Sequence, residues 1–153
     1  MSNKERTLVL VKPDAVQRGL TGTIIQRLEN RGLKIIGLKF LQLTRELANK
    51  HYAAHQDKPF FPGLVNFITS GPITAIALEG ENAVEAVRQT MGVTDPIKAS
   101  SGTIRGDFGL NIGRNLIHGS DSPESAISEL SIYFQADELT DWNWAQDNWV
   151  TES

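Results

Sequence analysis

The stretch TLVLVKPDAVQRGLTGTIIQRLENRGLKIIGLKFLQL, residues 7–43, sets the architecture because its hydrophobic period changes along its length. Residues 7–11 form a short β-rich run that ends at Pro13, which predicts a strand running into a loop. Ahead of Gly32, apolar side chains fall on one helical face and predict an amphipathic helix of about three turns. Residues 33–43 predict a second, longer strand. The stretch therefore predicts a strand–helix–strand unit.

The rest of the chain continues this alternation of helices and strands. The further predicted elements are a helix capped by Thr44 through RELANKHYAAH, a buried helix within 59–71, a strand over 72–80, a helix over 81–92, a long loop over 92–115, a short strand over 116–118 and a helix capped by Ser122 with Pro123 at its first position. With two central strands that can pair antiparallel, this order predicts an α+β ferredoxin-like sandwich. We expect a four-stranded antiparallel sheet covered by helices, with the long loop ahead of His118. A small doubly wound parallel sheet is the alternative, which the extra helices between the second and third strands disfavour.

Composition and charge are those of an ordinary globular protein. The chain has 153 residues, of which 40% are hydrophobic and 22% charged, so we expect a single domain over residues 1–153. The net charge of −3 argues against a dedicated nucleic-acid site, because such sites usually carry a basic surplus. The absence of cysteine excludes disulfides and thiolate metal sites. No apolar run reaches signal-peptide or membrane-spanning length, so we expect no membrane association and a cytoplasmic location.

His51 and His55, in the segment HYAAH, are four residues apart and are expected on one face of the second helix. A two-histidine metal site is possible there, but the segment lacks the glutamate of the HExxH pattern. A solvated helix face, or one histidine near an anion, is the favoured interpretation.

His118 differs from the other histidines in its neighbours, Gly119, Ser120 and Asp121. The glycine removes side-chain bulk beside the ring, and the two polar residues offer hydrogen-bond partners. The helix that follows presents free N–H groups and a dipole that favour anions, and Glu129 lies on it where it could orient the imidazole. An ordinary imidazole near pH 7 is both basic and nucleophilic. On these residues alone, two interpretations stay open: a packed histidine at a strand end, and a nucleophile beside an anion site.

Three basic residues, Lys12, Arg88 and Arg105, are candidates for binding phosphate. Arg105 lies in the glycine-rich segment GTIRGDFG, which suits close backbone approach and a bidentate guanidinium contact. The chain has neither GxxxxGK[ST] nor GxGxxG, so bound phosphates would depend on scattered basic side chains. The tripeptides RGD (105–107) and DFG (107–109) are chance matches, because the protein-kinase HRD and glycine-rich ATP loops are absent.

Several motifs together resemble the nucleoside diphosphate kinase family. They are LVKPDAVQRGL near the start, KPFFPGLV, TSGP, GTIRGDF and NLIHGSDS, and the resemblance covers about residues 5–152. It implies an enzyme that transfers the γ-phosphate of a nucleoside triphosphate, typically ATP, to a nucleoside diphosphate by a ping-pong mechanism. It implies further that His118 is phosphorylated on Nδ1, that base and sugar specificity is broad, and that the activity maintains NTP and dNTP pools.

The resemblance also assigns roles to individual residues and to Mg²⁺. It implies that Ser120 and Glu129 hold the His118 imidazole, and that Asp121 helps through water to hold Mg²⁺, which is bound mainly by the nucleotide phosphates. Glu152 matches a position that reaches a base in a neighbouring subunit. The nucleotide-binding positions it implies are Lys12 and Asn115 for ribose and phosphates, Tyr52, His55, Arg88, Thr94 and Arg105 for the triphosphate, and Phe60, Leu64 and Ile112 for the base.

The family resemblance implies a homo-oligomer, either a hexamer or a tetramer. The long loop and the tail with Trp142, Trp144 and Trp149 are similar to those of hexameric members. The segment DPIKASSG (95–102) departs from the common NPADSKPG, and Ser101 replaces a proline there, which predicts a less rigid loop.

Two other functions fit parts of the sequence. A histidine phosphocarrier would share His118 but needs no base slot, so Phe60, Leu64 and Asn115 argue against it. A ferredoxin-like RNA-binding module needs exposed sheet aromatics and a basic face, and the sequence has no RNP1-like motif.

Overall fold

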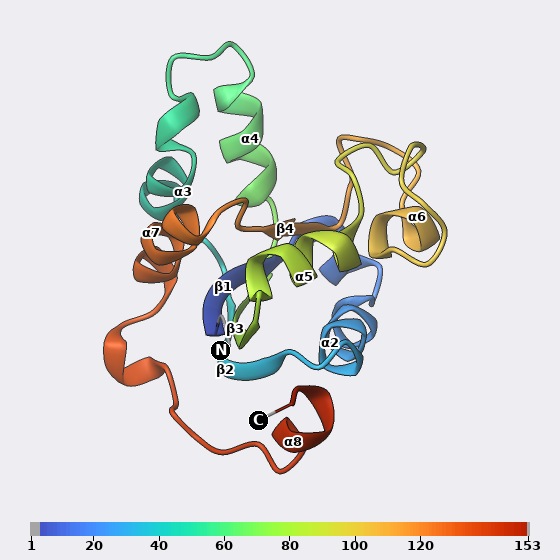
Figure 1. Ribbon diagram of the computed structural model, residues 1–153. Coiled ribbons are helices and arrows are strands. Elements are labelled where there is room, and N and C mark those ends of the chain that lie inside the picture. Colours follow the sequence, from blue (N-terminus) through green and yellow to red (C-terminus); the bar gives the residue numbers. More distant parts are fainter. Residues whose placement is uncertain (1–3, 153) are drawn as a thin grey trace.

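A four-stranded antiparallel sheet organises the protein, whose computed structural model describes residues 4–152 (Figure 1). The strands are β1 (Lys4–Val11), β2 (Lys34–Leu41), β3 (Ile73–Glu81) and β4 (Ile117–Gly119). They lie in the order β2-β3-β1-β4, and each adjacent pair is antiparallel. The predicted α+β ferredoxin-like sandwich is confirmed, and the parallel alternative is wrong.

Helices lie before, between and after these strands. They are α1 (Pro13–Gln17), α2 (Thr21–Asn30), α3 (Arg45–His51), α4 (Phe61–Ile68), α5 (Ala83–Met91), α6 (Ile104–Phe108), α7 (Pro123–Tyr133) and α8 (Asp147–Val150), with the 3₁₀ turns η1 (Ala53–His55) and η2 (Ala136–Glu138). Within residues 4–152, none of them has the length and apolarity needed to cross a membrane.

Strand β1 is buried on both faces of the sheet, which explains its continuous apolar run. Val9 and Val11 belong to a core that includes the buried sides of α2 and α5. Leu8 and Leu10 point the other way, into a core that includes the buried sides of α3, α4 and α7. The strand next to the candidate nucleophile is therefore held from both sides.

Two short helices lie where loops were predicted. Helix α1 begins at Pro13, whose fixed φ and missing N–H suit a first helical position, and Asp14 adds an acidic side chain to that first turn. Helix α6 falls inside the predicted 92–115 loop and begins at a capping hydroxyl, since Thr103 Oγ1 accepts the N–H of Gly106 at 3.0 Å. The loop prediction was thus wrong for both five-residue segments. The predicted caps of α3 and α7 are confirmed, because the Thr44 and Ser122 hydroxyls each accept a first-turn N–H.

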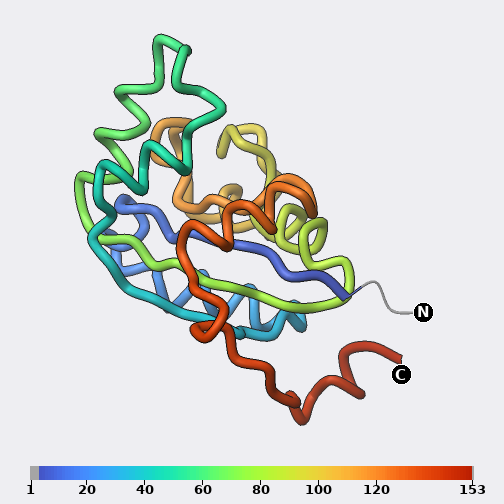
Figure 2. Tube along the Cα trace, turned by 90° about the vertical axis from the view of Figure 1, so that its left-hand side faces the viewer, coloured from blue at the N-terminus to red at the C-terminus, as the bar shows by residue number. Residues whose placement is uncertain are grey.

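The C-terminal segment runs along β2, an edge strand of the sheet. The Thr140 N–H donates to the carbonyl of Ile36 at 2.8 Å, and Trp142 Nε1 donates to the carbonyl of Ile35 at 2.9 Å. Leu38 and Phe40 of β2 remain 53% and 65% exposed. Figures 1 and 2 show this tail at the opposite end of the molecule from the projecting α3–α4 hairpin.

Candidate active site

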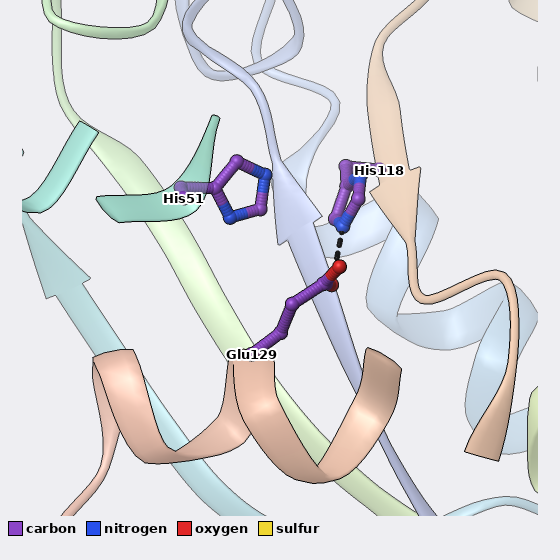
Figure 3. A group of neighbouring side chains, drawn as sticks. All are labelled: His51, His118 and Glu129. Carbon is purple, nitrogen blue, oxygen red and sulfur yellow. Dashed lines mark hydrogen bonds and ion pairs between the residues drawn. The ribbon is translucent and has the colours of Figure 1, made fainter. Parts of the chain in front are cut away.

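Strand β4 and helix α7 bring three predicted site residues together. His118 lies in the middle of β4, opposite Leu10 of β1. Glu129 points back from α7, and its Oε1 lies 2.7 Å from His118 Nε2 (Figure 3). Ser120 Oγ donates to the same carboxylate oxygen at 2.9 Å. One carboxylate therefore fixes both the imidazole and the hydroxyl.

Glu129 decides which ring nitrogen of His118 stays open. Burial would raise the pKa of Glu129, but the hydrogen bonds from His118 and Ser120, together with the charge interactions with His118 and His51, lower it. An ionised carboxylate can only accept, so the proton of the neutral imidazole belongs on Nε2. Nδ1 then keeps its lone pair, and the His118 side chain is 28% exposed. In this tautomer the unprotonated nitrogen is the one that does not face Glu129.

The backbone just before His118 is held in a conformation that only tertiary contacts can maintain. Leu116 has φ 77°, in the left-handed region that a branched side chain rarely adopts. Its N–H donates to Asp14 Oδ2 at 3.0 Å, and its carbonyl accepts the N–H of Lys12 at 2.9 Å. Asp14 was missed in the sequence analysis, since its partner is 102 residues away.

His51 is a neighbour of His118 that the sequence analysis placed wrongly. Helix α3 ends at His51, and the next turn, η1, is a 3₁₀ helix, so His51 and His55 do not share one helical face. The ring centroids of His51 and His118 are 4.6 Å apart, with the ring planes at 78° (Figure 3). Burial, together with the His118 charge, lowers the pKa of His51 to about 3, so its ring is neutral near pH 7. No short-range signal in HYAAH predicts this contact, which depends on how α3 packs against α7.

A chain of hydrogen bonds joins the end of β1 to the 92–115 segment. Lys12 Nζ donates to Asn115 Oδ1 at 2.8 Å, and Asn115 Nδ2 donates to the carbonyl of Thr94 at 3.1 Å. Burial lowers the pKa of Lys12 to about 8, Asp14 opposes the shift, and the nearby charge of Arg105 adds to it. The lysine is thus a desolvated cation among other cations.

Arg105 is buried and hydrogen-bonds to backbone carbonyls around the site. Burial lowers its pKa to about 10, and the charge of Arg88 adds to the shift, so it stays charged near pH 7. Arg88 Nη1 donates to the carbonyl of Gly119 at 3.1 Å. The guanidinium of Arg105 uses three of its five N–H groups on backbone carbonyls, those of Gly92 (3.1 Å), Asn115 (3.1 Å) and Ile117 (2.6 Å). The charge of Arg105 thus acts on Lys12, and the charge of Arg88 acts on Arg105.

The predicted base-binding residues come from two separate segments. Phe60 precedes α4 and is 51% exposed, and its ring centroid lies 5.5 Å from that of His55. Leu64 lies one turn further along, half-buried in α4. Ile112 follows α6 and is 58% exposed. In Figure 1 the α3–α4 hairpin and the segment after α6 rise on the same side of the sheet, apart from each other. Apolar side chains are therefore exposed on both segments.

Three remaining predicted residues differ in their distance from His118. Tyr52 stacks edge-on against His51 with centroids 4.7 Å apart, and burial raises its pKa to about 12, which keeps its hydroxyl protonated. Asp121 is exposed in the turn between β4 and α7. Glu152 follows α8, and α8 lies at the opposite end of the molecule from the α3–α4 hairpin (Figure 1). Within one chain, Glu152 is not part of this cluster.

Comparison with known proteins agrees with this geometry. The family model for nucleoside diphosphate kinase matches residues 5–139 of the chain. A nucleoside diphosphate kinase of Herpetosiphon aurantiacus is 57% identical over 148 residues, which cover 97% of this chain and 99% of that protein.

Solved structures extend the similarity to three dimensions. A halophilic nucleoside diphosphate kinase of Halobacterium salinarum, in complex with CDP, superposes with a TM-score of 0.94 at 54% identity, over 97% of this chain and 99% of that one. A nucleoside diphosphate kinase family protein of Babesia bovis also gives 0.94, at 42% identity, over 96% and 99%. The chain therefore belongs to the nucleoside diphosphate kinase family of phosphotransferases.

Proposed function

We propose that the protein transfers the γ-phosphate of a nucleoside triphosphate, typically ATP, to a nucleoside diphosphate through a phosphohistidine at His118. The observation that carries this proposal is the 2.7 Å contact between Glu129 Oε1 and His118 Nε2, which leaves Nδ1 as the free nucleophile. Such an activity equalises NTP and dNTP pools, because each half-reaction breaks and makes bonds of similar energy.

Each half-reaction is one in-line displacement. The Nδ1 lone pair attacks the γ-phosphorus, the bond to the bridging oxygen breaks, and the diphosphate leaves with that electron pair. The ring becomes cationic, and Glu129, already ionised and hydrogen-bonded to Nε2, stabilises this charge. A diphosphate acceptor then attacks the phosphoryl group from the leaving-group side and restores neutral His118. Ping-pong kinetics follow.

The cations of the site would bind the transferring phosphates. The charge of Arg105 acts on Lys12 and that of Arg88 acts on Arg105, so a bound polyanion would relieve this repulsion. The same cations would offset negative charge on the phosphate oxygens. Tyr52, His55, Thr94 and Asn115 complete the proposed contacts to phosphates and ribose. Mg²⁺ would be bound mainly by the nucleotide phosphates, with the exposed Asp121 carboxylate, a hard oxygen donor, assisting through water. When bound, the ion neutralises phosphate charge.

Base recognition would depend on stacking and apolar contact rather than on hydrogen bonds. Phe60 and Leu64 would form one wall of the base slot and Ile112 the other, and their exposure leaves these surfaces free. Every base has a π-face, so stacking tolerates all of them and specificity is broad. The halobacterial relative is described in complex with CDP, a pyrimidine nucleotide.

We propose further that residues 1–153 act as one domain in a cytoplasmic homo-oligomer, a hexamer rather than a tetramer. Exposed apolar side chains support association: Leu38 and Phe40 on the edge strand β2, and Leu110, 81% exposed, after α6. In such an assembly Glu152 would reach a neighbouring subunit's base.

The test is a labelling experiment with γ-labelled ATP and Mg²⁺. We expect an acid-labile, base-stable label on the protein, which leaves when GDP is added and appears in GTP. His118→Asn, which keeps a polar side chain of similar reach, should abolish both label and turnover. Turnover above ~1% of wild type in that variant would overturn the phosphohistidine route.

A further inference from the structure

Among residues 4–152, one cluster has the donor atoms of a metal site. His51 from α3, His118 from β4 and Glu129 from α7 each offer one ligating atom, and these atoms all lie within 4.8 Å of one another (Figure 3). We propose that His51, His118 and Glu129 bind a transition-metal ion such as Zn²⁺, and that this ion switches off the nucleophile.

The donor set suits zinc and disfavours magnesium. Two imidazoles and a carboxylate are a known three-ligand set for tetrahedral Zn²⁺ with a fourth position open to water, whereas Mg²⁺ prefers oxygen ligands. Metal–ligand bonds of about 2.0–2.1 Å place tetrahedral ligands roughly 3.3 Å apart. His118 Nε2 and Glu129 Oε1, now 2.7 Å apart, would separate slightly, and His51, whose ligand atom lies within 4.8 Å of the other two, would approach through side-chain rotation.

His51 is available as a ligand. Its Nδ1 is buried and has no hydrogen-bond partner among residues 4–152. The titratable or charged groups around the His51 ring are His118, Glu129, Lys12, His55, Tyr52 and Tyr133. The open fourth position would face the solvent that reaches the His118 side chain, 28% exposed.

Metal binding and phosphoryl acceptance are mutually exclusive on the same imidazole. In the metal-free protein, hydrogen bonding to Glu129 favours the tautomer with the His118 proton on Nε2 and the lone pair on Nδ1. A metal takes the Nε2 lone pair, so the ring proton moves to Nδ1 and the free lone pair there is lost. Glu129 exchanges its hydrogen bond for a metal bond. Zn²⁺ should therefore inhibit transfer reversibly, a consequence that rests on the proposed function, whereas the binding itself does not.

The first experiment is calorimetric titration of the nucleotide-free full-length protein with Zn²⁺, supported by the visible spectrum of bound Co²⁺. We expect one tight ion per chain and the intense absorption of tetrahedral Co²⁺. His51→Phe keeps an aromatic ring of similar shape but removes a ligand, and should weaken binding at least tenfold. Glu129→Gln is a second variant with the same expectation, and His55→Phe, at an exposed histidine outside the cluster, is the matched control that should keep the affinity. Equal affinity in wild type and His51→Phe, or no binding at all, would overturn the site.

A transfer assay at buffered free Zn²⁺ separates the metal site from the proposed function. Two results together would support the switch. Zn²⁺ should inhibit wild type in a way that a chelator reverses, and it should not inhibit the turnover that remains in His51→Phe. A protein that binds Zn²⁺ in the absence of nucleotide but never becomes phosphorylated would retain the metal site and refute the proposed function. Transfer that is equally Zn²⁺-sensitive in wild type and His51→Phe would refute the switch alone.

Discussion

Replacing Lys12 with methionine should remove two pH effects that the wild type shows: stability that rises with pH, and nucleotide affinity that falls with pH. Burial lowers the pKa of Lys12 to about 8 from its ordinary value of 10.5. Between these two values the unfolded chain keeps a proton that the folded chain has released, so the unfolded state binds more protons and stability rises with pH. The cost of charging the buried lysine is about 3 kcal/mol at full effect, and about 2 kcal/mol of it disappears between about pH 7.5 and 9.5.

The assay is urea unfolding of wild type and Lys12→Met at one protein concentration and at both pH values. Methionine has a similar length and no titration, so the lost contact to Asn115 is a constant offset. Between about pH 7.5 and 9.5, we expect the free energy of unfolding of wild type to rise by about 2 kcal/mol relative to that of the variant. Curves that run parallel would refute the desolvated lysine.

Nucleotide affinity should change in the other direction. If charged Lys12 binds phosphate, as we propose, raising the pH removes that charge from the free protein. The affinity of wild type for ADP should then fall by roughly tenfold or more between about pH 7.5 and 9.5, while Lys12→Met binds weakly and shows no such fall. Affinity that is equally pH-independent in both proteins would remove Lys12 from the phosphate site.

Glu129→Gln should slow phosphoenzyme formation about 10²-fold, because an amide neither stabilises the cationic ring nor fixes its proton on Nε2; an unchanged single-turnover rate would contradict that role. Arg105→Lys should lower the free energy of unfolding by about 2 kcal/mol even without substrate, since a compact ammonium group cannot span three carbonyls that are now reached by three separate guanidinium nitrogens; urea unfolding measures this, and an unchanged midpoint would show that these hydrogen bonds do not stabilise the fold. Phe60→Ala should raise KM roughly tenfold for all bases alike, and steady-state kinetics with purine and pyrimidine diphosphates would expose a selective effect as a contradiction of stacking.

Features that depend on neighbouring residues could be predicted from the sequence. Thr44 and Ser122 cap their helices because a hydroxyl reaches an N–H only three residues away. Glu129 could be matched to His118 because a single helix begins just after the histidine and carries the carboxylate back past it. The strand over 7–11 followed from an apolar run that only a fully buried strand needs.

Features that depend on tertiary packing could not be predicted. His51 lies beside His118 because α3 packs against α7, and nothing in HYAAH carries that information. Leu116 has a positive φ without being glycine, since Asp14 and Lys12 hold its backbone groups. Helix α6 was hidden because it is only five residues long and includes Gly106, a poor helix former.

The strand order has a consequence for how the chain folds during synthesis. Strand β1 is made first, yet it lies between β3 and β4, so its partners are Ile73–Glu81 and Ile117–Gly119, both far downstream. Until residues 117–119 have left the ribosome, β1 has at least one open edge, and such long-range pairing is slow and prone to aggregation. The nascent chain should therefore acquire native protease resistance late and cooperatively, after residue 119 emerges. His118 lies on β4, so it is ordered by the same event that completes the sheet.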